Sequence, residues 1–192
     1  MVFDGILLSI IIGFLRKGSL KGLADFHVKH GWIFPVLLLI EVFVFIMQDK
    51  ILFVKTLSNY IYILVYIVGL FFLYINRHHR GFTIILIGVL LNFIVIAANG
   101  GRMPVSIEAA TVLDPVFVDM LKNGDLYAKH QALTSDTNLG FLGDIIPITD
   151  PYPKSQVISI GDVIMNVGIF IFIQWLMVTS RRTPSFKGGE TA

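Results

Sequence analysis

Five long apolar blocks constrain the fold of this chain more than any other feature of its sequence. Hydrophobic residues make up 55% of the chain and charged residues 15%, whereas about a quarter of the residues in a soluble domain are charged. The blocks are also too long for the core helices of a small globular domain. The sequence therefore predicts an all-α integral membrane protein, a five-helix transmembrane bundle in a single domain over residues 1–192. The predicted spans are about 2–15, 32–48, 57–75, 82–98 and 159–179.

The first block, 2–15, is shorter than the roughly 20 residues that a membrane-spanning helix needs. A signal peptide is the alternative, but the positive charge at Arg16 follows the apolar run instead of preceding it, and no A-x-A-like cleavage site comes after it. Gly5, Ser9 and Gly13 are spaced by four, and such a stripe of small residues lets another helix approach closely. We therefore interpret this block as a short membrane helix inside the bundle.

The basic residues predict how the chain is threaded. Nine of the fifteen lysines and arginines fall in the connection 16–29, the turn 77–80 and the tail 180–192, which lie on one side of the predicted membrane. The positive-inside rule assigns that side to the cytoplasm. The N-terminus and the long loop 99–158 are then extracytoplasmic, and the C-terminus is cytoplasmic.

The loop 99–158 separates the fourth block from the fifth. Asp114 followed by Pro115 is a typical helix start, and Gly124 is a typical stop, so a short helix is expected over 115–123. The prolines, glycines and apolar residues of the loop predict an ordered segment that packs back on the bundle. The chain has no cysteine, which excludes disulfides, thiolate catalysis and cysteine-ligated metals. A net charge of +2 is too small to argue for nucleic acid as a partner.

Polar residues on the predicted spans indicate where a ligand could bind. Asn92 and Asn99 lie on one stripe of the fourth span, while Asp162, in the first turn of the fifth, shares a face with Asn166. These side chains could meet near the outer leaflet, either as a ligand or proton site or as interhelical hydrogen bonds that order the bundle. The complete set of candidate ligand-binding residues is Asn92, Asn99, Arg102, His130, Asp144, Asp162 and Asn166.

Arg102 follows two glycines at the end of the fourth span, where free backbone amides and a guanidinium could bind an anion or a lipid headgroup. The alternative is a structural clasp, in which Arg102 pairs with Asp144 or Asp162. The C-terminal end of a helix dipole repels anions, which opposes the anion interpretation. Glu41 lies near the middle of the second span, where it could relay protons or bind a cation, or stay protonated and bond to a neighbouring tyrosine or asparagine.

His130 is the one histidine on the predicted outer side. With Asp144 or Asp162 it could form a general acid–base pair or a weak metal site, although no two ligand types have a diagnostic spacing. The alternative is a loop histidine bonded to the backbone. The sequence therefore predicts no catalytic residue, no metal and no cofactor.

Four segments carry a resemblance to a known family: 99–105 (NGGRMPV), 130–133 (HQAL), 142–147 (LGDIIP) and 159–162 (SIGD). With these segments the chain resembles an uncharacterised family of small bacterial multi-span membrane proteins, a domain of unknown function. The resemblance implies a bacterial plasma-membrane location and this topology, and it brings no activity.

Three functions remain open from the sequence. The first is a binding or transport-related membrane protein that holds a polar or anionic ligand at its outer mouth. The second is a structural or accessory subunit that docks through the outer loop. The third is a membrane-embedded enzyme acting on a lipid-linked substrate, which no motif supports. The expected partners are membrane lipids and either a second copy of the chain or another membrane protein.

Overall fold

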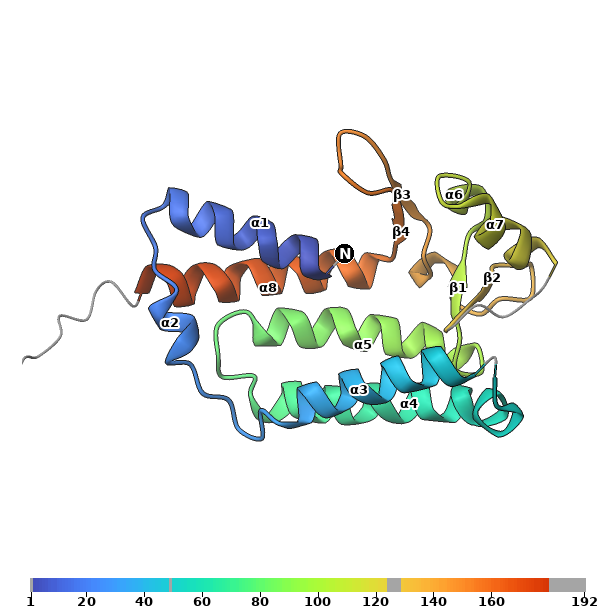
Figure 1. Ribbon diagram of the computed structural model, residues 1–192, viewed down its shortest axis with the longest axis horizontal. Coiled ribbons are helices and arrows are strands. Elements are labelled where there is room, and N and C mark those ends of the chain that lie inside the picture. Colours follow the sequence, from blue (N-terminus) through green and yellow to red (C-terminus); the bar gives the residue numbers. More distant parts are fainter. Residues whose placement is uncertain (1, 49, 124–128, 180–192) are drawn as a thin grey trace, which may run out of the picture.

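The computed structural model describes residues 2–48, 50–123 and 129–179, and within these ranges the chain is mostly helical. The predicted apolar blocks fold as helices that lie side by side in the spatial order α1, α8, α5, α4, α3 (Figure 1). Their bounds are α1 Val2–Leu15, α3 Ile33–Met47, α4 Leu52–Ile75, α5 Phe82–Ala98 and α8 Ile160–Thr179. The predicted tail, 180–192, lies outside the described residues.

Helix length separates these elements into two groups. Among the described residues, α4 and α8 are long and apolar enough to cross a membrane, whereas α1, α3 and α5 are apolar but shorter. Helix α4 begins at Leu52, earlier than the predicted start at 57. Its first turns contain the polar residues Lys55 and Ser58, which interrupt the apolar run from which the helix was predicted.

The connections gather at two opposite ends of the bundle (Figure 1). We call one the turn end: it contains α2 (Lys21–Ala24) and the turn 76–81 between α4 and α5. We call the other the loop end: it contains the long segment 99–159 between α5 and α8. The two basic connections within the described residues, 16–29 and 77–80, therefore lie together at the turn end.

Helices α5 and α8 run antiparallel and touch at two pairs of glycines. Gly88 faces Gly161, and Gly81 faces Gly168. A Cβ atom at Gly161 would lie 2.7 Å from the carbonyl oxygen of Gly88, so only glycine allows the two backbones to approach this closely. This contact fixes the place where polar residues of α5 meet the start of α8.

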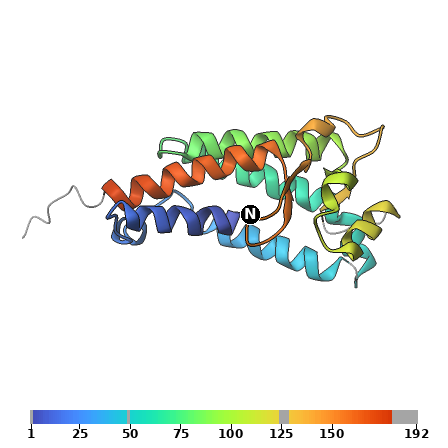
Figure 2. The same ribbon diagram turned by 90° about the horizontal axis from the view of Figure 1, so that it is seen from above.

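Helix α1 packs on the other side of α8 through the predicted stripe of small residues (Figure 2). Gly5 lies against Asn166, and Gly13 lies against the side chain of Met177. Ser9 is fully buried, and its carbonyl oxygen accepts a 2.6 Å hydrogen bond from Nε2 of Gln174. The prediction that this stripe admits a neighbouring helix is therefore confirmed.

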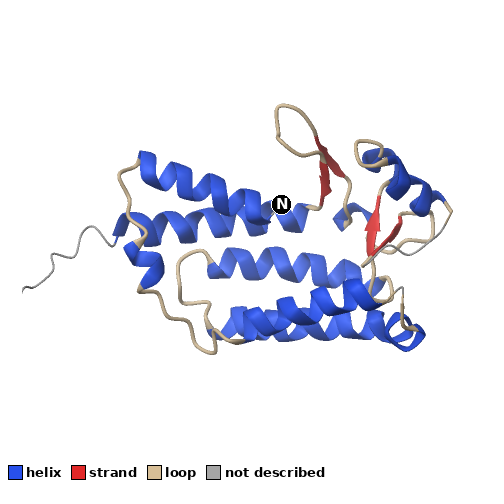
Figure 3. Cartoon of the chain, in the orientation of Figure 1, coloured by secondary structure: helices blue, strands red, loops and turns tan. Residues whose placement is uncertain are grey.

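The loop between α5 and α8 contains short strands, which the all-α prediction missed (Figure 3). Strand β1 (Met103–Val105) pairs in parallel with β2 (His130–Ala132), and β3 (Ile146–Ile148) pairs antiparallel with β4 (Gln156–Ile158). Three-residue strands are too short to produce an alternating pattern in the sequence. The existence of β1 and β2 also depends on pairing between segments that are distant along the chain.

The loop also contains two short helices, α6 (Ile107–Ala110) and α7 (Pro115–Lys122), and a 3-10 turn, η1 (Gly140–Leu142). The predicted helix after Asp114 is confirmed, because the Asp114 carboxylate accepts a 2.8 Å hydrogen bond from the Val116 amide. The loop has an apolar core of its own, formed by Val105, Ala110, Val118 and Leu121. The described parts of the loop thus fold into packed elements, as the sequence predicted.

The flank of the bundle leaves large apolar side chains exposed. On α3, Leu39 is 68% exposed, and on α4, Phe53 is 70% exposed. Similar exposed residues follow the outer faces of both helices and of α1, among them Leu7, Phe34, Phe43, Leu64 and Phe71. A soluble monomer rarely exposes a continuous apolar surface of this extent.

Candidate functional site

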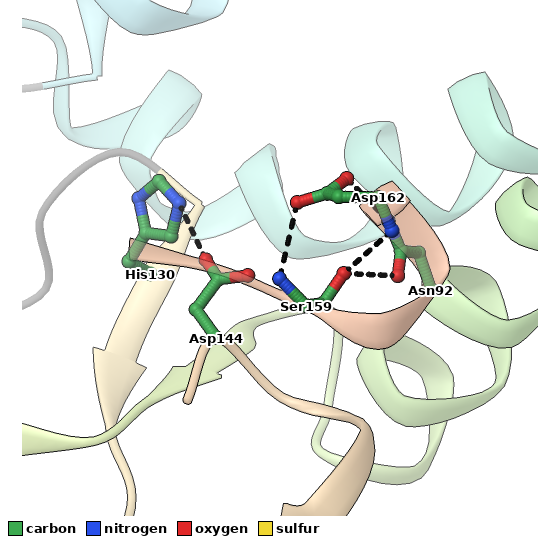
Figure 4. Close-up of polar contacts among 5 residues, drawn as sticks. All are labelled: Asn92, His130, Asp144, Ser159 and Asp162. Carbon is green, nitrogen blue, oxygen red and sulfur yellow. Dashed lines mark hydrogen bonds and ion pairs between the residues drawn. The ribbon is translucent and has the colours of Figure 1, made fainter. Parts of the chain in front are cut away.

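The polar residues at the start of α8 form a hydrogen-bonded group with α5 (Figure 4). Asn92 donates from Nδ2 to Oδ1 of Asp162 at 2.9 Å, and its Oδ1 accepts from the Ser159 hydroxyl at 2.8 Å. The Ser159 amide donates to the Asp162 carboxylate at 3.3 Å, and the Asp162 amide donates to the Ser159 hydroxyl at 3.0 Å. This reciprocal pair is a capping box for α8. The structure thus brings Asn92 and Asp162 together.

Asp144 lies beside this group, on the far side of Ser159 from Asn92 (Figure 4). Its backbone is held against β1, because its amide donates to Pro104 and its carbonyl accepts from the Ser106 amide. Gly143 makes this approach possible, since a Cβ there would lie 2.6 Å from the Pro104 carbonyl oxygen. The LGD segment therefore carries the Asp144 carboxyl group into the loop end of the bundle.

His130 comes to the same place from the first residue of β2. Its Nε2 lies 3.6 Å from Oδ2 of Asp144, so the two side chains form an ion pair when the imidazole is protonated. The parallel pairing of β2 with β1 sets this position, because Met103 is the register partner of His130. The predicted pair of His130 and Asp144 is therefore present.

Burial and neighbouring charge change the acidity of Asp144. The side chain is buried, and this burial, together with the smaller effect of the Asp162 carboxylate, raises the pKa of Asp144 to about 8, while the ammonium of Lys129 opposes the shift. One carboxyl oxygen, Oδ1, is buried without a hydrogen-bond partner among the described residues. Asp144 is therefore a carboxyl group that binds or releases a proton close to neutral pH.

Lys129, which the sequence analysis did not select, interacts electrostatically with both aspartates. The Tyr66 oxygen of α4 is the largest contribution that raises the pKa of Lys129 above its ordinary value, and burial acts in the opposite direction. Three carboxylates add to the shift, those of Glu41, Asp144 and Asp162. These carboxylates come from α3, from the loop and from α8, so the tertiary structure assembles the group around one ammonium.

Glu41 thereby joins the candidate site from within the bundle. It is half-buried on α3, six residues before the end of that helix at Met47, or about 9 Å along the axis. Its carboxylate is close enough to interact electrostatically with Lys129. We define the cluster of Glu41, Tyr66, Lys129, Asp144 and Asp162, with His130 beside it, as the loop-end cluster.

Arg102 makes its described contacts at α4. It is only 3% exposed, Nη2 donates to the Ser58 hydroxyl at 2.6 Å, and the guanidinium carbon lies 5.5 Å from the centre of the Tyr62 ring. Burial lowers the pKa of Arg102, and the Tyr62 oxygen opposes this shift. The preceding Gly101 has φ +91, and any side chain at this position would clash with the Asn59 backbone. The glycine turn therefore carries Arg102 towards α4.

Two other predicted site residues hold elements together. Asn99 donates from Nδ2 to the carbonyl of Asn138 at 2.8 Å and accepts from the Asn138 amide at 3.0 Å, which joins the loop to α5. Asn166 donates to the Asp162 carbonyl at 2.9 Å, and its side chain lies against Gly5 of α1. Neither contact involves the carboxyl groups of the loop-end cluster.

The weak metal site considered from the sequence requires three ligands close together. Within the described residues, no three histidine, aspartate or glutamate side chains are grouped closely enough to hold a metal ion. The loop-end cluster instead combines carboxyl groups, an ammonium and an imidazole, which can exchange protons and donate or accept hydrogen bonds.

One feature of the sequence could have identified Lys129 as a site residue. It directly precedes His130, in the same loop as Asp144.

Comparison with known proteins identifies the family of this chain. A model described as a family of unknown function, DUF5317, matches residues 25–174. A protein of Thermotoga maritima described as uncharacterized is 29% identical over 172 residues, which cover 90% of this chain and 89% of that protein. No solved structure matches the chain. In agreement with the resemblance to an uncharacterised family, the chain belongs to the DUF5317 family of unknown function.

Proposed function

We propose that this chain is a multi-span protein of the bacterial plasma membrane that binds a polar ligand at the loop end of its helical bundle, with uptake or release of a proton at Asp144. The observation that carries the proposal is the buried Asp144 carboxyl group, which lies 3.6 Å from His130 and within the field of Lys129 and Asp162.

The exposed apolar flank supports a membrane location. Helices satisfy their own backbone hydrogen bonds, so a bundle with apolar outer faces is suited to lipid. The shorter helices α1, α3 and α5 would cross by lying partly inside the bundle or by local thinning of the bilayer. In this arrangement the loop end is extracytoplasmic, because the basic connections at the turn end favour the cytoplasm.

Single cysteines test this topology, because the chain has no cysteine of its own. Ser135 is exposed at the loop end, and His78 is exposed at the turn end. In intact bacterial cells, a membrane-impermeant maleimide should label Ser135→Cys at once and His78→Cys only after permeabilisation. The reverse pattern would overturn the orientation, and recovery of both variants in the soluble fraction would overturn the membrane assignment.

The charges of the loop-end cluster favour a particular class of ligand. Three carboxyl groups interact electrostatically with one ammonium, and the buried Oδ1 of Asp144 is an acceptor without a donor among the described residues. A cation or a ligand with several hydrogen-bond donors fits this set better than an anion does. Glu41 extends the polar region into the bundle, which would suit a ligand that passes inward as well as one that only binds.

Arg102 was the main sequence argument for an anionic ligand, and its contacts support a different role. The side chain is buried against Ser58 and Tyr62 of α4, where it fastens the beginning of the loop to the bundle. We therefore assign the NGGR turn a structural role in holding β1 in place. The described contacts of Arg102 at α4 bring no second positive group beside it. They therefore do not support the lipid headgroup or anion that the sequence suggested for this position.

Infrared difference spectroscopy of the reconstituted protein tests the proton site. Between pH 6 and 9, centred near the pKa of about 8, the wild type should lose the carbonyl band of a protonated carboxylic acid as the pH rises. Asp144→Asn should lack that band, and the matched control Asp136→Asn, which changes an exposed aspartate of the same loop, should keep it. A band that persists in Asp144→Asn would contradict the assignment.

The same titration probes the ligand class when sodium chloride replaces choline chloride at equal ionic strength. A cation bound among the carboxyl groups competes with the proton, so sodium should shift the loss of the band to lower pH. Identical titrations in the two salts would exclude sodium-like cations and leave a ligand with hydrogen-bond donors as the proposed class.

A role as an accessory subunit is the second candidate, and one feature of the loop favours it. Val116 on α7 is 65% exposed and Phe141 on η1 is 62% exposed, beyond the ends of the bundle helices. Large apolar side chains at such a position are typical of a docking surface. Co-purification of a membrane protein that is lost in Phe141→Ser, with the Asp144 titration unchanged, would favour this function over ligand binding.

A further inference from the structure

A second site lies at the turn end, far from the loop-end cluster. It is a cavity of about 340 Å³ between the last turns of α8, the end of α1 and the turn before α5. Its lining residues are Arg16, Arg80, Phe170, Ile171, Gln174, Trp175 and Val178. The volume is within the range of small-molecule sites, and none of the described lining residues is acidic.

Buried polar contacts orient one of the two arginines. Gln174 is only 6% exposed, and its Nε2 is already committed to the Ser9 carbonyl of α1. Its Oε1 accepts a 2.9 Å hydrogen bond from Nη1 of Arg16. This relay fixes the guanidinium at the cavity while leaving its other N–H groups available, because one guanidinium carries five donors. The position of Arg16 is therefore built into the contact of α1 with α8.

Arg80, in the turn before α5, supplies the second positive charge in the lining. It precedes Gly81, which has φ +88 and whose position against the Gly168 carbonyl excludes any side chain. This tight turn holds the start of α5 against α8 and so keeps Arg80 beside the cavity. Among the described residues, neither Arg16 nor Arg80 has an ion-pair partner.

The rest of the lining is apolar, which distinguishes this cavity from a site for a fully hydrated ion. Phe170, Ile171 and Val178 form its α8 wall, and Trp175 has the amphipathic ring that is typical of a membrane interface. Ile171 is also among the exposed large apolar residues of the bundle. Two guanidinium groups beside an apolar wall match a phosphate group that is attached to a hydrocarbon chain.

We propose that this cavity binds the phosphate of an anionic phospholipid on the cytoplasmic face of the membrane. The inference rests on the membrane location and orientation proposed above, which place the turn end at the cytoplasmic surface. Basic pockets between membrane helices on that side are suited to anionic headgroups. The shared chemistry is a phosphate held by two arginines, and the free ion is the alternative source of that phosphate.

Native mass spectrometry of the full-length chain in detergent tests the site with phosphatidylglycerol, phosphatidylcholine of the same acyl chains, and inorganic phosphate. The wild type should bind one phosphatidylglycerol in preference to phosphatidylcholine. Arg80→Gln and Arg16→Gln should each weaken that binding about fivefold, the effect of one basic residue near an anionic surface.

Arg77→Gln is the matched control, because Arg77 lies in the same turn but stacks 4.0 Å from the centre of the Tyr74 ring instead of lining the cavity. It should bind phosphatidylglycerol as the wild type does. The Arg80 side chain is exposed and has no hydrogen-bond partner among the described residues, so Arg80→Gln should remain folded. Arg16→Lys keeps the positive charge and is the folding control for Arg16→Gln.

Three results would overturn the proposal. They are equal phosphatidylglycerol binding by the wild type and the Arg16→Gln, Arg80→Gln double variant, equal binding of the two lipids, and displacement of phosphatidylglycerol by an equal concentration of inorganic phosphate. A chain that stays soluble without detergent would instead overturn the membrane location, so the two failures can be told apart.

Discussion

Gly161→Ala is expected to lower the free energy of unfolding by about 3 kcal/mol, through overpacking at the α5–α8 crossing. The added methyl would lie 2.7 Å from the Gly88 carbonyl oxygen and against the Asn92 side chain. The Asn92 side chain is the nearest obstacle, and the Gly88 carbonyl oxygen beside it is backbone that no side-chain rotation can move. Full relief of the strain therefore requires α5 to move away from α8. That movement would also break the hydrogen bond between Asn92 and Asp162. Thermal unfolding in detergent micelles, followed by circular dichroism, measures the loss.

Gly69→Ala is the matched control for this prediction. It makes the same chemical change within α4, where the nearest atom to the new methyl is a Leu37 methyl carbon at 3.8 Å, an ordinary contact. Alanine favours a helix over glycine by up to about 1 kcal/mol, so this variant should melt at or above the wild-type temperature. Equal melting temperatures for Gly161→Ala and Gly69→Ala would contradict the close approach of the two helices.

The stability of the bundle is expected to fall as the pH rises through neutrality, because of Asp144. The native carboxyl group keeps its proton up to a pKa of about 8, whereas the unfolded chain releases it near 3.8. Between these values the native state binds more protons than the unfolded state, so the free energy of unfolding decreases with pH by up to about 1.4 kcal/mol per pH unit. The stabilisation is complete below the unfolded pKa and is lost as the pH passes the folded pKa.

Asp144→Asn should remove this slope, because the amide has nearly the shape of the protonated acid and does not titrate. Melting temperatures at pH 5, 6, 7 and 8, in the same detergent, would be compared with those of Asp136→Asn. The Asp136 side chain is exposed, so its substitution should leave the slope as it is in the wild type. A slope that survives in Asp144→Asn would assign the effect to another group of the loop-end cluster.

Much of the helical framework could be predicted because it depends on local sequence. Apolar runs give helices wherever they occur, and Asp114 before Pro115 marks a helix start through a hydrogen bond within three residues. The stripe of Gly5, Ser9 and Gly13 identified a contact face without naming its partner. What the sequence lacked was the strand pairing in the loop, since Met103 and His130 are register partners from distant segments.

The candidate site likewise contains residues that the sequence placed correctly and residues that it did not. Asn92 and Asp162 were predicted to meet because each lies on a polar face at a helix end, and they are 2.9 Å apart. Lys129 was missed, and Arg102 was expected beside the aspartates but contacts Ser58 at 2.6 Å instead. Both outcomes depend on the path of the loop, which turns at Gly101 and returns at β2. No local pattern contains that path.

The sequence by itself determined the apolar helices, the separation of basic connections from the polar loop, and the residues with the capacity for chemistry. It did so because hydrophobic periodicity, capping and charge act over a few residues. The tertiary structure alone decided which of those residues share one site. Glu41, Lys129 and Asp144 come together because α3, β2 and the segment beside β1 converge at the loop end, where burial raises the pKa of Asp144 to about 8. The burial that changes this acidity exists only after the chain has folded.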